Sequence, residues 1–136
     1  KKNGVILINE PEVSFFLRFF QFILTEEPWS LKVNIFNSKK NIFKSNNPWA
    51  SNTAVARLLF DDEDQFNHFF PEYKICRNDL SEFFIFFNSG GVYNEVIYIP
   101  LSKFFLKLLD YIDYILISLF PSIFALNRTV ILKRIK

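Results

Sequence analysis

The sequence has little of the residues that build the most recognisable functional sites. It holds three glycines, one cysteine, one histidine and no methionine among 136 residues. The single cysteine, Cys76, cannot form an internal disulfide, and the single histidine, His68, leaves no cluster of ligands for zinc. An excess of one charge is also lacking, since 16 Lys plus Arg stand against 14 Asp plus Glu. We therefore expect no metal site and no nucleic-acid partner held mainly by charge.

Apolar side chains are what the sequence has in abundance. Half of the residues are hydrophobic, 22% are charged, and 19 are phenylalanine. Such a composition excludes disorder, and the length suits one domain or part of one. We expect residues 1–136 to form a single unit that buries a sizeable core and covers further apolar surface with another molecule.

Long uncharged runs are absent as well, which bears on membrane association. The longest one near the C-terminus, residues 114–127, is interrupted by Pro121 and is shorter than the ~20 residues of a spanning helix. The chain opens on Lys1 and Lys2, but the apolar run that follows is too short for a secretory signal. We expect a fragment or a processed product of a longer protein, located in the cytoplasm and able to contact a membrane peripherally.

The first apolar run, residues 5–8, predicts a strand. Its continuous hydrophobicity is typical of a strand buried on both faces in the parallel sheet of an α/β fold. Asn9, Glu10 and Pro11 follow it, and ligands of such sheets bind at the carboxyl ends of the strands. Glu10 is therefore a candidate site residue, although the same residues also suit a plain strand end.

Apolar periodicity predicts two helices in the first half of the chain. Residues 14–24 place their polar side chains on one narrow stripe, which predicts a helix buried over most of its girth. The acidic residues 61–64 suit a helix N-terminus, and Pro71 ends that helix near Phe70. Residues 53–60 fit a strand or a helix, and both alternatives stay open.

The remaining segments predict a loop and several strands. Residues 25–52 are dense in Asn, Ser and Pro and carry two tryptophans beside prolines, which indicates a long loop or lid. Apolar, β-branched segments that indicate strands are residues 73–76, 83–87 and 124–135.

The clearest helix spans residues 100–120. Its polar residues fall within about 140° of the helical wheel, taking 100° per residue; they are Lys103, Lys107, Asp110, Asp113 and Ser118. The remaining apolar face is wider than packing on one neighbour needs. We predict that part of it stays uncovered, and that the helix between Leu101 and Phe120 contacts a protein partner or a membrane surface.

Several segments, in this order, are similar to a known family. Gly4 to Pro11 joins a glycine, an apolar run and Glu-Pro, as in the fifth strand of that family's fold. Glu26-Glu27-Pro28, residues 47–54, residues 66–75, Ser89-Gly90-Gly91 and residues 125–133 follow, the last like a seventh, antiparallel strand. Together they resemble the C-terminal, substrate-side half of a class I S-adenosylmethionine-dependent methyltransferase. The resemblance implies an α/β fold: part of a doubly wound, Rossmann-like sheet whose last strands are antiparallel.

This resemblance also implies a function and its residues. The cofactor would be S-adenosylmethionine and the substrate an unknown small-molecule methyl acceptor. Glu10 would lie in the substrate pocket, with Glu27, Trp49 and Asn52 as lid contacts. The family holds its cofactor at a glycine-rich loop after the first strand.

Glycines stand here only at positions 4, 90 and 91, so no such loop is present. We expect no tight binding of S-adenosylmethionine and no methyl transfer by this chain without its cofactor-binding half. The alternative is a non-enzymatic, Phe-rich interaction module.

Overall fold

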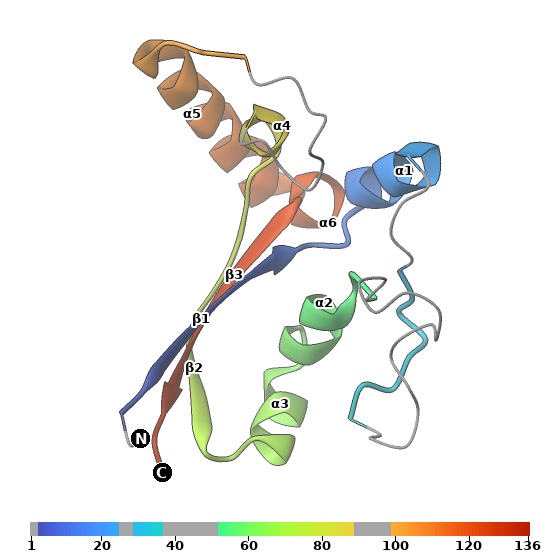
Figure 1. Cartoon of the computed structure of the whole chain (residues 1–136), viewed down its shortest axis with the longest axis vertical. Coiled ribbons are helices and arrows are strands. Elements are labelled where there is room, and N and C mark those ends of the chain that lie inside the picture. The colour runs from blue at the N-terminus through green and yellow to red at the C-terminus, as the bar shows by residue number, and fades with distance from the viewer. Residues whose placement is uncertain (1–2, 25–28, 37–51, 89–98) are drawn as a thin grey trace.

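The structure is a computed structural model that describes residues 3–24, 29–36, 52–88 and 99–136. The described part combines a three-stranded antiparallel sheet with six helices (Figure 1). In chain order the elements are β1 (Val5–Pro11), α1 (Phe15–Leu24), α2 (Val55–Phe60), α3 (Glu63–Phe69), β2 (Tyr73–Ser81), α4 (Phe84–Asn88), α5 (Lys103–Leu119), α6 (Pro121–Phe124) and β3 (Asn127–Arg134).

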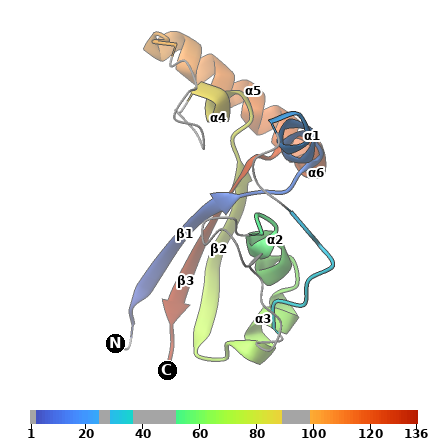
Figure 2. The same ribbon diagram turned by 45° about the vertical axis from the view of Figure 1, so that its right-hand side comes forward.

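The sheet has the order β1-β3-β2, so the last strand of the chain is the central one (Figure 2). β3 is antiparallel to both neighbours, and its register with β1 runs from Val5 opposite Lys133 to Pro11 opposite Asn127. β1 and β2 consequently run in the same direction and end at the same edge of the sheet. Residues 5–8 and the strand within residues 124–135, both predicted from the sequence, therefore lie in one sheet.

The expected burial and pairing of the first strand are wrong. β1 is an edge strand with an antiparallel neighbour, and the side chains of Val5 and Leu7 are 65% and 66% exposed. The backbone N–H of Glu12 donates to the carbonyl oxygen of Leu126, and the carbonyl oxygen of Gly4 accepts from the N–H of Arg134. The backbone N–H and C=O groups of the even-numbered residues of β1 therefore point toward β3. The N–H of Leu7 points away from β3, because hydrogen-bonded positions alternate along a strand, and no other strand of the described residues pairs with β1 on that side, its free edge. An apolar run therefore marks strand propensity here without showing burial.

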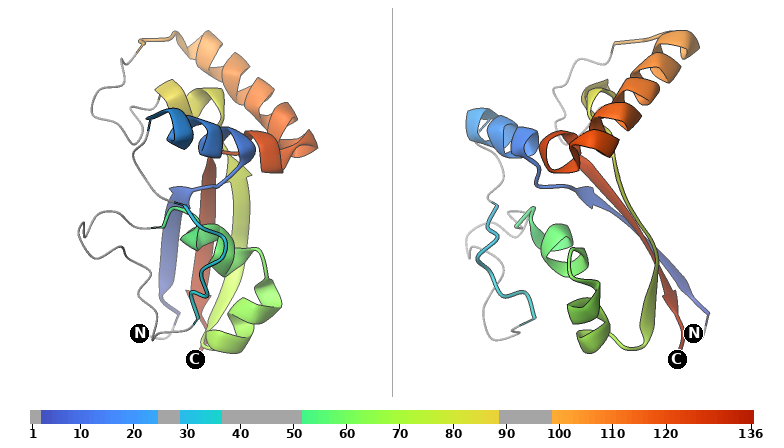
Figure 3. Two further views of the ribbon diagram at one scale, coloured as in Figure 1. Left: turned by 90° about the vertical axis from the view of Figure 1, so that its right-hand side faces the viewer. Right: turned by 180° about the vertical axis from the view of Figure 1, so that it is seen from behind.

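Helices cover the sheet in two groups (Figure 3). α2 and α3 lie along one face and enclose a core cluster of Ala56, Phe60, Phe66, Val130 and Leu132. α1, α4, α5 and α6 gather at the end of the sheet where β1 and β2 finish. Their core cluster contains Val13, Leu17, Ala54, Phe83 and Leu126. The polar ends of the strands thus lie between two apolar clusters.

Helix α1 forms where it was predicted but is less buried than expected. Leu17 is buried, whereas Phe15, Phe19 and Phe22 are exposed. The open alternative at residues 53–60 resolves as α2, and α3 begins in the acidic run as predicted. The Oδ1 atom of Asp62 caps α3 by accepting from the N–H of Gln65 at 2.8 Å.

The strand expected at residues 83–87 is instead the short helix α4. The residues expected to form one long helix from 100 to 120 form α5, followed at Pro121 by the separate turn of α6. Among the described residues, no helix combines the length and apolarity needed to cross a membrane.

Candidate functional site

Polar groups gather at the edge of the sheet where β1 and β2 end. Glu12 directly follows β1, Glu82 directly follows β2, and β3 begins there with Asn127 and Arg128. Asn127 Nδ2 donates to Asn9 Oδ1 at 2.9 Å, so the strands are joined at this edge by side chains as well as by backbone. In open, mostly parallel α/β sheets, ligands bind at the carboxyl ends of the strands, and the carboxyl ends of β1 and β2 lie at this edge.

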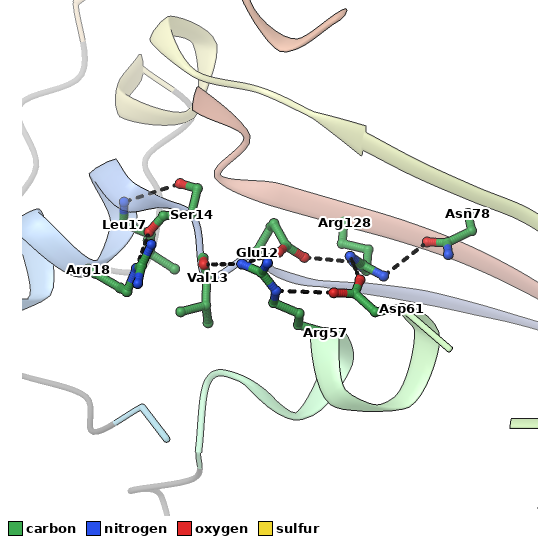
Figure 4. A network of polar contacts seen from close by, with 9 residues as sticks. All are labelled: Glu12, Val13, Ser14, Leu17, Arg18, Arg57, Asp61, Asn78 and Arg128. Atoms are coloured by element: carbon green, nitrogen blue, oxygen red, sulfur yellow. Dashed lines mark hydrogen bonds and ion pairs between the residues drawn. The ribbon is translucent and has the colours of Figure 1, made fainter. Parts of the chain in front are cut away.

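Four charged side chains form a closed network at the end of β1 (Figure 4). Arg128 Nε lies 2.7 Å from Glu12 Oε2, and Arg128 Nη2 pairs with Asp61 Oδ1. Arg57 contacts the same two acids, with Nη1 3.6 Å from Glu12 and Nε 3.1 Å from Asp61. Each arginine therefore touches both carboxylates, and opposite charges alternate around the ring.

The network connects elements that are far apart in the sequence. Glu12 follows β1, Arg57 lies on α2 and Arg128 on β3, while Arg57 also donates to the backbone oxygen of Val13 at 2.8 Å. Burial raises the pKa of Glu12, although both arginines act against this shift. Because each charge already has a partner, we assign the network a structural role: it holds the end of β1 and the start of β3 against α2.

A cavity of about 550 Å³ opens beside the carboxyl end of β2. One wall is the stretch from Arg77 to Glu82, and α5 supplies the other with Asp110, Asp113 and Tyr114 among its lining residues. Arg77 pairs with Asp79 across one residue. The remaining acids leave the cavity with negative charge, which favours a cationic or hydrogen-donating ligand.

Glu82 is the most perturbed residue of this cavity. Its backbone has φ 60, a left-handed conformation that is costly for a residue with a Cβ. Burial, and then the charge of Asp113, raises the pKa of its carboxyl group. Backbone strain and a raised pKa in one cavity-lining carboxylate are features of functional positions.

Asp113 fixes one wall of the cavity to the other. It is buried, and its carboxylate accepts from the backbone N–H groups of Phe83, Phe84 and Ile85 at 2.9, 2.9 and 3.1 Å. Asp113, which the helical wheel groups with the polar residues of its helix, thus lies on the side of α5 that packs on the chain. The carboxylate of Asp113 thus supplies the acceptors that the first N–H groups of α4 need. This explains why a helix forms where a strand was predicted.

The structure does not bring the predicted site residues together in one pocket. Glu10 lies on β1 opposite Arg128, with its side chain exposed. Asn52 is buried and binds the backbone of Ser30 in both directions, each at 2.8 Å, and accepts from Ala54 N at 3.1 Å. It fastens a loop to the start of α2. Glu27 and Trp49 lie outside the described residues, so their predicted lid contacts stay predictions.

Sequence reasoning missed Glu82, Glu12 and Arg128. A signal for Glu82 existed, because it is a single acid between the end of a strand and an apolar run. Glu12 and Arg128 carry no local signal, since their pairing spans most of the chain length. Only the fold reveals that two charges so far apart share one buried position.

Among the described residues there is no glycine-rich loop of the kind that holds S-adenosylmethionine in the family that the sequence resembles. Their one glycine, Gly4, precedes β1, and Glu12, Val13 and Ser14 after β1 are buried. In the same part of the chain, no three His, Cys, Asp or Glu side chains are placed to hold a metal ion.

No protein-family model, curated protein or solved structure matches this chain.

Proposed function

We propose that this chain is the substrate-side part of a methyltransferase-like domain whose cofactor is held by another part. The observation that carries the proposal is the place of β3: it comes last, lies between β1 and β2, and is antiparallel to both. The resemblance in the sequence implies a last strand of this orientation. β1 and β2 then present their carboxyl ends at one edge, where a substrate would bind.

The acceptor site in this proposal is the cavity beside β2. Tyr114 offers an exposed aromatic ring, while Asp79, Glu82 and Asp110 offer acceptors for a donor group. A carboxylate whose pKa is raised is a better base near neutral pH, so Glu82 is the residue placed to take a proton from an amine or hydroxyl acceptor. The chain's own share of the reaction is to bind and orient the acceptor and to accept that proton.

The test measures ligand binding to the isolated chain through changes in its amide NMR shifts. Three small molecules serve as ligands: benzylamine, phenol and benzoate. We expect shifts at Tyr114 and Ser118 in the order benzylamine, phenol, benzoate, because the cavity is acidic. Glu82→Gln should weaken benzylamine binding about fivefold to tenfold, as expected for one charge-assisted contact. Glu63→Gln, on the exposed first turn of α3, is the matched control. If none of the probes shifts the cavity residues, the acceptor site is refuted.

A second candidate function, an interaction module, is favoured by the accessible surface. In the described part of the chain, large apolar side chains stay exposed on β1, α1 and α5, among them Leu7 at 66%, Phe22 at 83% and Phe104 at 71%. Exposed apolar surface of this kind marks sites that contact another molecule. Sedimentation velocity together with binding of a hydrophobic dye tests this candidate. A monomer that binds no dye would contradict it.

A further inference from the structure

Helix α5 presents three distinct faces along its 17 residues. One face packs on the chain through side chains that include Asp113 and Ile117, both buried. A second face is apolar and exposed over the full length of the helix; it comprises Phe104, Phe105, Leu108, Tyr111, Ile115 and Leu119. We call these six residues the outer stripe. They occupy about 120° of the helical wheel at 100° per residue.

The third face is polar and borders the outer stripe. It holds Lys103 and Lys107, followed along the wheel by Asp110. Cations at a helix N-terminus are opposed by the helix dipole, and the first turn of α5 has no acidic residue to balance them. Lys103, the first residue of α5, therefore does not stabilise the helix. Together with Lys107 in the next turn and the positive end of the dipole, it concentrates positive charge at one end of the outer stripe.

The position of α5 leaves this surface accessible. α5 lies at the end of the molecule opposite the C-terminus, and its N-terminal half extends away from the sheet (Figures 1 and 3). Phe104, the most exposed residue of the outer stripe at 71%, lies in that half. Aromatic and leucine side chains on one face with lysines beside them are the composition of helices that lie in a membrane interface.

We propose that α5 binds an anionic lipid surface, with the outer stripe in the acyl boundary and Lys103 and Lys107 at the headgroups. Charge complementarity selects this occupant over a second copy of the chain. In an antiparallel pair of α5 helices the lysines would meet the tyrosine and serine residues of the same polar face, because Asp110 lies on the far side of the lysines from the outer stripe. The lipid contact is separate from the cavity beside β2, so each can fail without the other.

The experiment is flotation of the whole chain with vesicles of phosphatidylcholine alone or with a quarter of phosphatidylserine. We expect binding to the phosphatidylserine vesicles, weakened about tenfold or more by Phe104→Ser with Leu108→Ser. Leu7→Ser, an equally exposed apolar residue on β1, is the matched control and should bind like the parent chain. Circular dichroism confirms that each variant is folded.

Charge variants test the electrostatic part separately. Lys103→Gln and Lys107→Gln should each lower binding to the anionic vesicles roughly fivefold, equivalent to about 1 kcal/mol per lysine. Lys74→Gln on β2 should not. The proposal is overturned if the chain does not float with the anionic vesicles, or if Leu7→Ser and the outer-stripe variant lose binding equally. It is also overturned if lipid-free sedimentation velocity shows a dimer that Phe104→Ser dissociates, since a second copy then covers the outer stripe.

Discussion

Replacing Arg128 by methionine tests how far the four-charge network holds the fold together. Arg128 is 4% exposed and contacts both Glu12 and Asp61. Methionine keeps much of the apolar volume but removes the charge, so buried Glu12 retains only Arg57, at 3.6 Å. Breaking a buried ion pair by removing one partner costs about 3–5 kcal/mol. The free energy of unfolding of a typical domain is about 5–15 kcal/mol, so this loss is a large share of it.

The loss should depend on pH in a stated direction. Arg128 lowers the pKa of Glu12, so its removal leaves the effect of burial less opposed and the pKa rises further. A protonated Glu12 tolerates burial better than a charged one. We therefore expect Arg128→Met to be less destabilising at pH 5 than at pH 8. The double variant Arg128→Met with Glu12→Leu should recover most of the stability, because no unpaired charge remains in the buried position.

The assay is urea unfolding followed by circular dichroism, analysed as a double-mutant cycle. Arg77→Met is the matched control: Arg77 pairs with Asp79, but its side chain is 62% exposed, so its loss should cost less than about 1 kcal/mol. If Arg128→Met costs no more than Arg77→Met, the network does not stabilise the fold, and the role assigned to it is refuted.

Three further predictions concern other parts of the fold. Asp113→Ala should destabilise the chain by about 2–3 kcal/mol in urea unfolding, because three backbone N–H groups at the start of α4 lose their acceptor; Asp113→Asn should cost less. Because the pKa of the Glu82 carboxyl group is raised in the folded chain, its ionisation lowers the free energy of unfolding as the pH rises from the ordinary pKa of 4.5 through the raised pKa. The gain from Glu82→Gln should therefore be absent at pH 4 and grow toward pH 8, and a constant difference in melting temperature would contradict this. Leu7→Pro should change stability by less than about 1 kcal/mol, because the N–H it removes faces the free edge, whereas Ile6→Pro should cost about 3 kcal/mol or more; equal melting temperatures would refute the assigned edge.

Local pattern predicted the elements better than it predicted their surroundings. The strands at residues 5–8 and 124–135, the helix after Ser14 and the helix that begins in the acidic run all form. Their signals are short-range: β-branched runs, a capping aspartate, a closing proline. What surrounds each element depends on which others pack against it, and this is why β1 and α1 are exposed where burial was expected.

Asp113 shows the limit of a helical wheel. On the wheel it stands at the edge of the polar residues of α5, and that edge borders the buried face. Its partners are backbone N–H groups of another helix, which no pattern within α5 can reveal. The same reason hid the cavity: its two walls come from residues 77–82 and from α5, and only the packing of α5 beside β2 brings them together.

The central position of β3 has a consequence for the order of folding. β1 and β2 pair with β3 and not with each other, so no two-stranded part of the sheet can form before β3 is available. Val5 and Lys133 pair although they lie 128 positions apart in the sequence, and contacts of such sequence separation form slowly. During synthesis, β1 has no β3 to pair with until residues 127–134 have left the ribosome. Over that interval the side of β1 that will pair with β3 is an apolar strand edge that chaperones can bind and that other chains can capture.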